Sequence, residues 1–256
     1  MSKQAILAVS FGTTYATTRA KTIDATVAQL QAAHPTYRVV QAYTSGIVRR
    51  RILANENLAI DSPEVALAKL RTAGYDEVII QSLHLLPGWE YQLLEKLLQA
   101  EHDHFKVLRL TPPLLASFED FQRITAFMKQ EAASLATDEA ILWMGHGSSH
   151  SCFTMYACLD HMLTDSANFV AAVESYPSLA HELPLLQARG VKKVHLQPLM
   201  LVAGNHAHND MAGGKDSWQE QLQQHGFEPM ACFKGLGEYP AIQQMFVDKL
   251  KMVLED

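Results

Sequence analysis

Cysteine is scarce in this chain of 256 residues, and the three present are Cys152, Cys158 and Cys232. An odd number without paired spacing predicts neither a disulfide framework nor a Cys-x-x-Cys metal site. Long apolar runs are also missing, since none approaches the roughly 20 residues that span a bilayer. No charged segment followed by a long apolar one opens the chain, so we expect no signal peptide. These absences predict a cytoplasmic protein that does not associate with membranes.

Positive charge is in deficit, with 21 Lys and Arg against 27 Asp and Glu and a formal net charge of −6. General nucleic-acid binding needs a basic surface, so we expect no nucleic-acid partner. Neither GxGxxG nor GxxxxGK[ST] occurs, and we therefore expect no nucleotide cofactor. The 48% hydrophobic and 19% charged content is typical of a globular protein. The sequence leaves the oligomeric state open, a homo-oligomer included.

Short apolar runs alternate with helical patterns along the chain. We expect strands at 5–10, 37–43, 77–84, 106–110, 140–145, 169–173, 193–201 and 229–233. We expect helices at 16–33, 62–73, 90–100, 154–165, 178–189, 216–225 and 240–254. Alternation of this kind, with continuously apolar strands, predicts an α/β fold with parallel sheets covered by helices on both faces.

The two halves of the chain resemble each other in sequence. Residues 5–14 (AILAVSFGTT) align with 140–149 (AILWMGHGSS), and 74–78 (GYDEV) align with 190–194 (GVKKV). The same register places Glu90 over His206. An internal duplication is therefore predicted; the alternative is two unrelated α/β halves of similar composition.

We expect two doubly wound parallel-sheet lobes with a cleft between them. The predicted divisions are an N-terminal lobe at 1–115, a connecting helix at 116–136, a C-terminal lobe at 137–237, and a final helix at 238–256 that packs back on the first lobe. Such sheets bind ligands beyond the carboxyl ends of their strands. Functional residues are therefore sought at the strand ends.

Three strand ends of the second half carry candidate metal ligands. His146 lies between two glycines, Glu174 follows the apolar run FVAAV, and His206 follows the third strand. Imidazole and carboxylate suit late first-row metals, and Asp210 could orient an imidazole. A set with open positions suits a metal that arrives and leaves. The alternatives are a histidine bonded to its own loop and a glutamate favoured by a helix dipole.

The first half has different residues at the matching places. The candidates for ligand contact are Phe11, Thr13, Thr44, Ser45, His84 and Glu90. His84 is equally explained as a buried histidine with its hydrogen bonds satisfied. The run Arg49-Arg50-Arg51 is either a solvated helix face or a clamp for a polycarboxylate, because guanidinium matches carboxylate in a forked geometry.

Several segments together resemble the anaerobic sirohydrochlorin cobaltochelatases. They include LAVSFGT (7–13), YTSG (43–46), QSLH (81–84), MGHG (144–147), YACLDH (156–161), VESYP (173–177) and PLMLVAG (198–204), and the resemblance runs through nearly the whole chain. It implies a two-lobed chelatase fold related to ferrochelatase, with His146, Glu174 and His206 binding the metal. It also implies cobalt(II) and sirohydrochlorin as substrates, in cobalamin synthesis before the ring contracts.

The resemblance leads to a hypothesis about how the pyrrole protons are removed. Two pyrrole protons must leave as the metal enters, so a base is required, either a ligating imidazole or a neutral histidine on the opposite side of the ring.

Iron or nickel insertion is the first alternative to cobalt insertion, because ligand type does not fix metal choice. A non-catalytic metal or tetrapyrrole binding protein is the second, and a zinc-dependent hydrolase with the same ligands is the third.

Overall fold

The computed structural model describes residues 2–255, which form two compact units. Unit 1 comprises the chain before Ser117 together with the chain after Leu236, and unit 2 is Ser117–Leu236. None of the helices described is long and apolar enough to cross a membrane. The helix predicted as a connection, α6 (Phe118–Glu131), belongs to unit 2, and α10 (Pro240–Glu255) belongs to unit 1.

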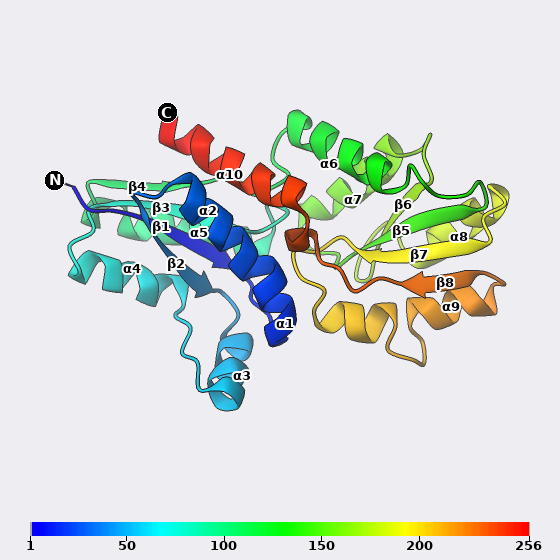
Figure 1. Ribbon diagram of the computed structural model, residues 1–256, viewed down its shortest axis with the longest axis horizontal. Coiled ribbons are helices and arrows are strands. Elements are labelled where there is room, and N and C mark those ends of the chain that lie inside the picture. Colours follow the sequence, from blue (N-terminus) through cyan, green and yellow to red (C-terminus); the bar gives the residue numbers. More distant parts are fainter. Residues whose placement is uncertain (1, 256) are drawn as a thin grey trace. The chain divides into compact units, whose positions relative to one another are not determined.

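Unit 1 is built on a parallel sheet with strand order β2-β1-β3-β4 (Figure 1). The strands are β1 (Gln4–Ser10), β2 (Arg38–Tyr43), β3 (Glu77–Ser82) and β4 (Val107–Leu110). The helices are α1 (Ala16–Arg19), the π-helical η1 (Ala20–Asp24), α2 (Ala25–Ala33), α3 (Gly46–Glu56), α4 (Pro63–Thr72), α5 (Trp89–Glu101) and the 3₁₀ turn η2 (His102–His104).

The two faces of this sheet are covered by different helices. Leu67 of α4 and Leu94 of α5 pack with Leu7 of β1 in one buried cluster. Helix α10 packs along α2 (Figure 1), and Arg109 of β4 donates to the Val253 carbonyl oxygen of α10 at 2.5 Å. Segments from both ends of the chain therefore complete one unit.

Unit 2 repeats this architecture with strand order β6-β5-β7-β8. The strands are β5 (Glu139–Gly145), β6 (Asn168–Ala172), β7 (Lys193–Pro198) and β8 (Glu228–Ala231). The helices are α6, the 3₁₀ turn η3 (Ser151–Phe153), α7 (Thr154–Met162), α8 (Leu179–Ala188), the π-helical η4 (Ala207–Met211) and α9 (Trp218–Gln224), followed by the 3₁₀ turn η5 (Leu236–Glu238).

The predicted fold class is confirmed, because the two units share topology and register. Ala5 pairs with Val78 in the first sheet, and Ala140 pairs with Val194 in the second. These are the residues that the sequence alignment of the halves superimposes. Such agreement is what an internal duplication produces.

Some predicted boundaries were wrong for local reasons. Strand β7 ends at Pro198, which has no N–H to donate to a ladder. Strand β3 ends at Ser82, whose hydroxyl accepts from the backbone N–H of His84 at 3.2 Å. The helix predicted at 16–33 contains the π-helical segment η1, where the Thr22 hydroxyl donates to the Thr18 carbonyl at 2.6 Å.

Candidate metal centre

The carboxyl ends of β5 and β6 continue to pair beyond the strands. The backbone N–H of Val173 donates to the Gly145 carbonyl, and that of Glu174 donates to the His146 carbonyl, both at 3.0 Å. On the other side of β5, the N–H of Leu199 donates to the Met144 carbonyl at 2.8 Å. The three loops that carry the predicted ligands are thus held together by backbone hydrogen bonds.

Glycine is required on both sides of His146 because the backbone approaches its neighbours closely. A Cβ on Gly145 would lie 2.2 Å from Cε1 of Tyr156, which is closer than non-bonded atoms approach. A Cβ on Gly147 would lie 2.8 Å from the backbone nitrogen of Glu174, and Gly147 has a φ of +92°. The sequence Gly-His-Gly therefore lets the histidine loop fit between Tyr156 and the end of β6.

Tyr156 of α7 supports the same loop, a role that the sequence analysis missed. Its hydroxyl oxygen accepts a hydrogen bond from the backbone N–H of Gly147 at 3.3 Å. Burial raises the pKa of Tyr156 to about 12, so the hydroxyl stays neutral at physiological pH. No pattern in the sequence distinguishes this tyrosine from one that only fills the core.

The side chains of His146 and His206 lie in direct contact. Their rings meet edge to face, with 4.3 Å between centroids and 90° between planes. Both are partly exposed, His146 at 44% and His206 at 31% of the side chain. Because metal–nitrogen bonds are about 2.0–2.1 Å long, rings this close can reach one ion.

Each imidazole is engaged through Nδ1. Nδ1 of His146 lies 2.9 Å from the Gly147 carbonyl oxygen, and Nδ1 of His206 lies 2.6 Å from Oδ2 of Asp210. A carbonyl or carboxylate partner fixes the proton on Nδ1 and leaves the Nε2 lone pair free. Among residues 2–255, neither Nε2 atom has a hydrogen-bond partner, so both imidazoles keep this nitrogen available to a metal.

The π-helical turn η4 accounts for the geometry of His206. His206 is the residue immediately before this turn, and Asp210 lies four residues later, on the same side. The pair therefore forms within one short segment of the chain. The predicted role of Asp210 in orienting an imidazole agrees with this contact.

Glu174 is the most loosely held of the three predicted ligands. Its Oε2 lies 3.9 Å from Nδ1 of His146, and its side chain is 58% exposed. In the part of the chain that the structure describes, no three His, Cys, Asp or Glu side chains already surround a common ion position. The structure brings the three residues together at one edge of the sheet, without forming a closed cage.

Two nearby histidines point to structural roles. Nδ1 of His150 accepts from the backbone N–H of Cys152 at 3.1 Å and caps the turn η3. His208 stacks on Phe233, with 4.7 Å between ring centroids and 17° between planes. Neither contact includes the facing pair of His146 and His206.

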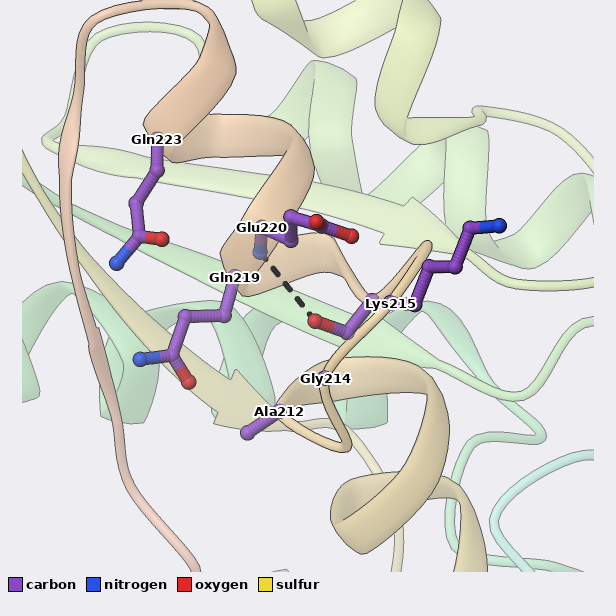
Figure 2. Close-up of a pocket in the computed structure, with 7 residues that line it drawn as sticks. Ala212, Gly214, Lys215, Gln219, Glu220 and Gln223 are labelled. Carbon is purple, nitrogen blue, oxygen red and sulfur yellow. Dashed lines mark hydrogen bonds between the residues drawn. The ribbon is translucent and has the colours of Figure 1, made fainter.

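A cavity of 330 Å³ in unit 2 lies away from these histidines. Figure 2 shows it beside the start of α9, lined by Ala212, Gly214 and Lys215 and by Gln219, Glu220 and Gln223 of the helix. The marked hydrogen bond is the helix cap, in which the backbone N–H of Glu220 donates to the Ser217 hydroxyl at 3.3 Å. The lining of the cavity contains no histidine or cysteine, so the cavity offers no soft metal ligands.

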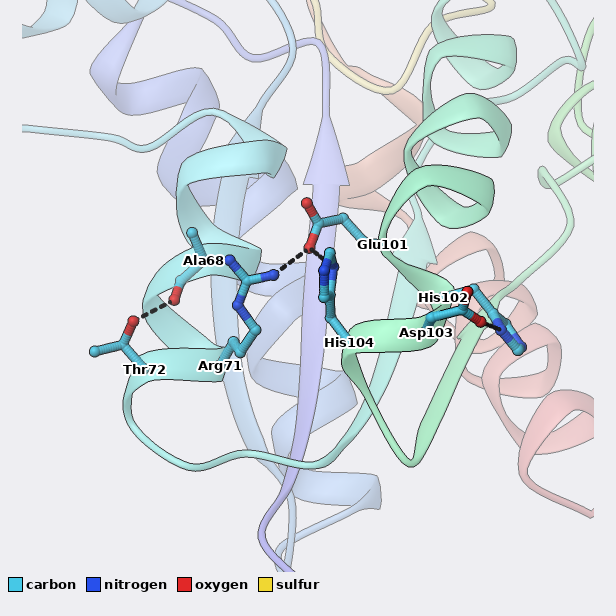
Figure 3. A network of polar contacts seen from close by, with 7 residues as sticks. All are labelled: Ala68, Arg71, Thr72, Glu101, His102, Asp103 and His104. Atoms are coloured by element: carbon cyan, nitrogen blue, oxygen red, sulfur yellow. Dashed lines mark hydrogen bonds and ion pairs between the residues drawn. The ribbon is translucent and has the colours of Figure 1, made fainter.

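A second group of histidines, in unit 1, belongs to a surface network. Nδ1 of His104 lies 3.1 Å from Oε2 of Glu101, which also accepts from Arg71 at 2.9 Å (Figure 3). His102 contacts Asp103 at 3.3 Å. These residues precede β4 and therefore lie at the amino ends of the strands, opposite the edge where ligands bind.

The candidates in unit 1 lie at the carboxyl ends of its strands. Phe11 is 50% exposed, whereas Thr13 is buried and its hydroxyl accepts from the N–H of Tyr15 at 3.3 Å. The Ser45 hydroxyl caps α3 by accepting from the N–H of Val48 at 3.3 Å. Thr44 has a buried hydroxyl without a hydrogen-bond partner in the described structure.

His84 and Glu90 are the most unusual of these candidates. Nδ1 of His84 lies 3.0 Å from the Ser82 hydroxyl, whereas its Nε2 is buried without a partner among the described residues. Burial lowers the pKa of His84 to about 4, so the ring is neutral at physiological pH. Oε2 of Glu90, in the first turn of α5, is likewise buried and unpartnered. Such atoms ordinarily find a partner in a ligand or in water.

Comparison with known proteins identifies the class to which this fold and site belong. Residues 4–255 match the model of the family described as cobalt chelatase (CbiK). The chain belongs to this family. It is 43% identical over 256 residues to the sirohydrochlorin cobaltochelatase of Salmonella typhimurium, covering 98% of this chain and 97% of that protein.

Further relatives agree with this assignment. The sirohydrochlorin cobaltochelatase CbiKC of Nitratidesulfovibrio vulgaris is 35% identical over 215 residues, covering 82% of this chain and 76% of that one. Among solved structures, SirB from Bacillus subtilis with Fe³⁺ superimposes with a TM-score of 0.67 at 14% identity, over 97% of this chain and 94% of that chain. At this identity the structural likeness establishes the fold alone.

Proposed function

We propose that this protein inserts cobalt(II) into sirohydrochlorin. Membership of the cobalt chelatase family and the names of its curated relatives support this activity. The observation on this chain that carries the proposal is the pair of imidazoles, His146 and His206, whose free Nε2 atoms share one edge of the sheet in unit 2. Cobalt is a substrate here, so it must be released as well as bound.

The arrangement of the site suits a metal in transit. His146 and His206 bind cobalt(II) through Nε2, and Glu174 turns toward the ion from its exposed position. Asp210 holds the His206 ring through Nδ1 and raises its basicity as a ligand. With few protein ligands the ion keeps open positions, which the pyrrole nitrogens can occupy as it is transferred.

Proton balance sets the second requirement of the reaction. A divalent ion replaces two pyrrole N–H protons, so each turnover releases two protons. The two imidazoles that give up the metal each regain a free lone pair at Nε2, so each can accept one of these protons. His84 is the alternative acceptor, because its ring is neutral and its buried Nε2 has no partner in the described structure.

We further propose that the strand ends of unit 1 contact the macrocycle. The residues are Phe11, Thr13, Thr44, Ser45, His84 and Glu90. The exposed ring of Phe11 offers an apolar surface. The unpartnered buried atoms of Thr44, His84 and Glu90 offer polar contacts, which a ligand would satisfy.

The test is anaerobic turnover of purified protein with sirohydrochlorin and cobalt(II), followed by absorbance against a reaction without enzyme. We expect insertion well above the spontaneous rate, and its loss in a His146→Ala, His206→Ala double variant. His208→Ala is the matched control, since His208 stacks on Phe233 and should leave the rate unchanged.

The outcomes separate the alternatives. Binding of the ring without any rate above the control would replace the chelatase with a tetrapyrrole binding protein. Activity that survives in the double variant would keep the chelatase and refute the metal centre. Repeating the assay with iron(II) and nickel(II) ranks the metals, which the ligand set alone does not decide.

A further inference from the structure

Helix α3 presents two guanidinium groups at its own amino-terminal end. A Cβ built on Gly46, the first residue of the helix, would lie 3.4 Å from Nη1 of Arg50 and 3.7 Å from Nη2 of Arg49. Both side chains therefore fold back along the helix and converge over Gly46. The glycine leaves the space between them open, and no atom of Arg51 comes within 4 Å of that position.

Within residues 2–255, no carboxylate neutralises this pair. Arg19 and Arg71, also in unit 1, each hold a glutamate, whereas Arg49 and Arg50 have no ion-pair partner among residues 2–255. Two like charges held this close repel each other unless an anion lies between them. The arrangement is therefore that of a binding site for a negatively charged group.

The backbone adds to the positive potential. Helix α3 has 11 residues, and the N–H groups of Gly46 and Ile47 in its first turn have no partner in the described structure. Free N–H groups at a helix start carry a partial positive charge and bind anions. The guanidinium groups and the start of the helix therefore both favour the binding of an anion.

Buried polar atoms without partners also occur at the strand ends that adjoin this end of the helix. Ser10 is 2% exposed and Thr44 donates its N–H to the Ser10 carbonyl at 2.9 Å, so both lie at adjoining strand ends just before α3. Their hydroxyl oxygens are buried without partners, as is Nε of Arg49. Two unpartnered hydroxyl groups at these strand ends, and a buried Nε within one of the two unpaired guanidinium groups, are more than solvent exposure of a helix face explains.

We propose that the amino-terminal end of α3 binds a carboxylate side chain of the tetrapyrrole between Arg49 and Arg50. The identity of this ligand rests on the proposed function, since sirohydrochlorin carries several carboxylates around its ring. Guanidinium binds carboxylate through two parallel N–H bonds, which fixes orientation as well as charge. The site positions the macrocycle and takes no part in breaking bonds.

The test compares variants that remove positive charge at different positions of one helix. Arg49→Gln with Arg50→Gln removes the site, and Arg51→Gln removes one charge from the same helix at an exposed residue away from Gly46. Anaerobic titration with sirohydrochlorin gives the Kd, and turnover with cobalt(II) gives KM and kcat separately. Circular dichroism and thermal unfolding of every variant report on folding.

We expect the double variant to raise Kd and KM for sirohydrochlorin at least about tenfold, the range for lost charge-assisted hydrogen bonds. The value of kcat should stay within about twofold of wild type, because a positioning site does not act on the reacting atoms. Arg51→Gln should stay within about twofold in every constant. Should the double variant fail to fold, Arg50→Gln carries the test, with about a fivefold rise.

The outcomes distinguish this site from the proposed function. A double variant that binds as Arg51→Gln does, in a protein that inserts cobalt, refutes the carboxylate site and leaves the function intact. Arginine-dependent binding without insertion supports the site and refutes the function. A wild-type protein that does not bind sirohydrochlorin refutes both.

Discussion

Glu182 of α8 is buried in unit 2 without any group to stabilise its charge. Its side chain is 0% exposed, and neither carboxyl oxygen has a hydrogen-bond partner among the described residues. Burial, reinforced by the nearby charge of Asp160, raises the pKa of Glu182 to about 8. Replacing it in the variant Glu182→Gln removes the titration and keeps the shape of the side chain.

The direction of the effect follows from proton binding. Between its unfolded pKa of 4.5 and its folded pKa of about 8, Glu182 holds a proton in the folded protein and loses it on unfolding. Stability from this group is therefore complete below pH 4.5 and falls as the pH rises to about 8, by about 1.4 kcal/mol per pH unit. Between pH 4.5 and about 8, the contribution of Glu182 to the free energy of unfolding therefore falls by about 4–5 kcal/mol.

The effect of Glu182→Gln on stability should change sign between low and high pH. A buried amide with unpartnered N–H groups costs about 1–3 kcal/mol, so the variant should be less stable than wild type at about pH 5. Near pH 8.5, where wild type buries a charge, the variant should be more stable by about 2 kcal/mol.

Urea unfolding at several pH values between about 5 and 8.5 measures this difference. In a Trp89→Phe background, the fluorescence of Trp143 and Trp218 reports on unit 2 alone. Glu131→Gln, at an exposed residue of α6 in the same unit, is the control for loss of a negative charge. Stability curves of wild type and Glu182→Gln that run parallel across this range would refute the argument.

Three further predictions concern the metal centre and its unit. Gly147→Ala should lower stability by about 2–4 kcal/mol and reduce insertion, because its Cβ meets the Glu174 backbone at 2.8 Å; unfolding and turnover unchanged from wild type would contradict this. Asp210→Asn should leave folding intact and weaken cobalt(II) affinity about 10–100-fold in a metal titration, and wild-type affinity would refute the role of its contact with His206. Trp143→Phe should cost about 2–3 kcal/mol through the lost hydrogen bond to Asn168 at 2.8 Å, and a double-mutant cycle with Asn168→Ala that showed additive losses would contradict it.

The fold could be predicted from sequence because its signals are local and repeated. Apolar runs alternate with helical patterns, and the alignment of 5–14 with 140–149 anticipates the shared register of the two sheets. Strand ends were identifiable as well, since glycines flank His146 and an apolar strand precedes Glu174. Strands β7 and β3 end earlier than predicted, at Pro198 and at the contact between Ser82 and His84. Both features act through the backbone, which the hydrophobic pattern does not reveal.

The sequence named the residues of the candidate site, but not the contacts that hold their side chains. Chemistry alone nominated His146, Glu174 and His206, and residues at neighbouring parallel strand ends must lie close together. The sequence predicted His206 as the ligand of this loop, but a loop gives no fixed direction to its side chains. The structure adds the contact of His206 with Asp210 and the stacking of His208 on Phe233.

The sequence by itself determined the α/β class, the duplication and the residues at the strand ends, since these depend on periodicity and residue type, and its motifs carried the resemblance to the family. Only the tertiary structure decided which nitrogen of each imidazole is free, that Arg49 and Arg50 converge over Gly46 while Arg51 does not, and that Glu182 is buried without a partner. The first two depend on side-chain conformations within one loop or one helix, and the third depends on how α8 packs in unit 2. Hydrogen bonding and burial depend on neighbours in space, which the linear order of residues does not specify.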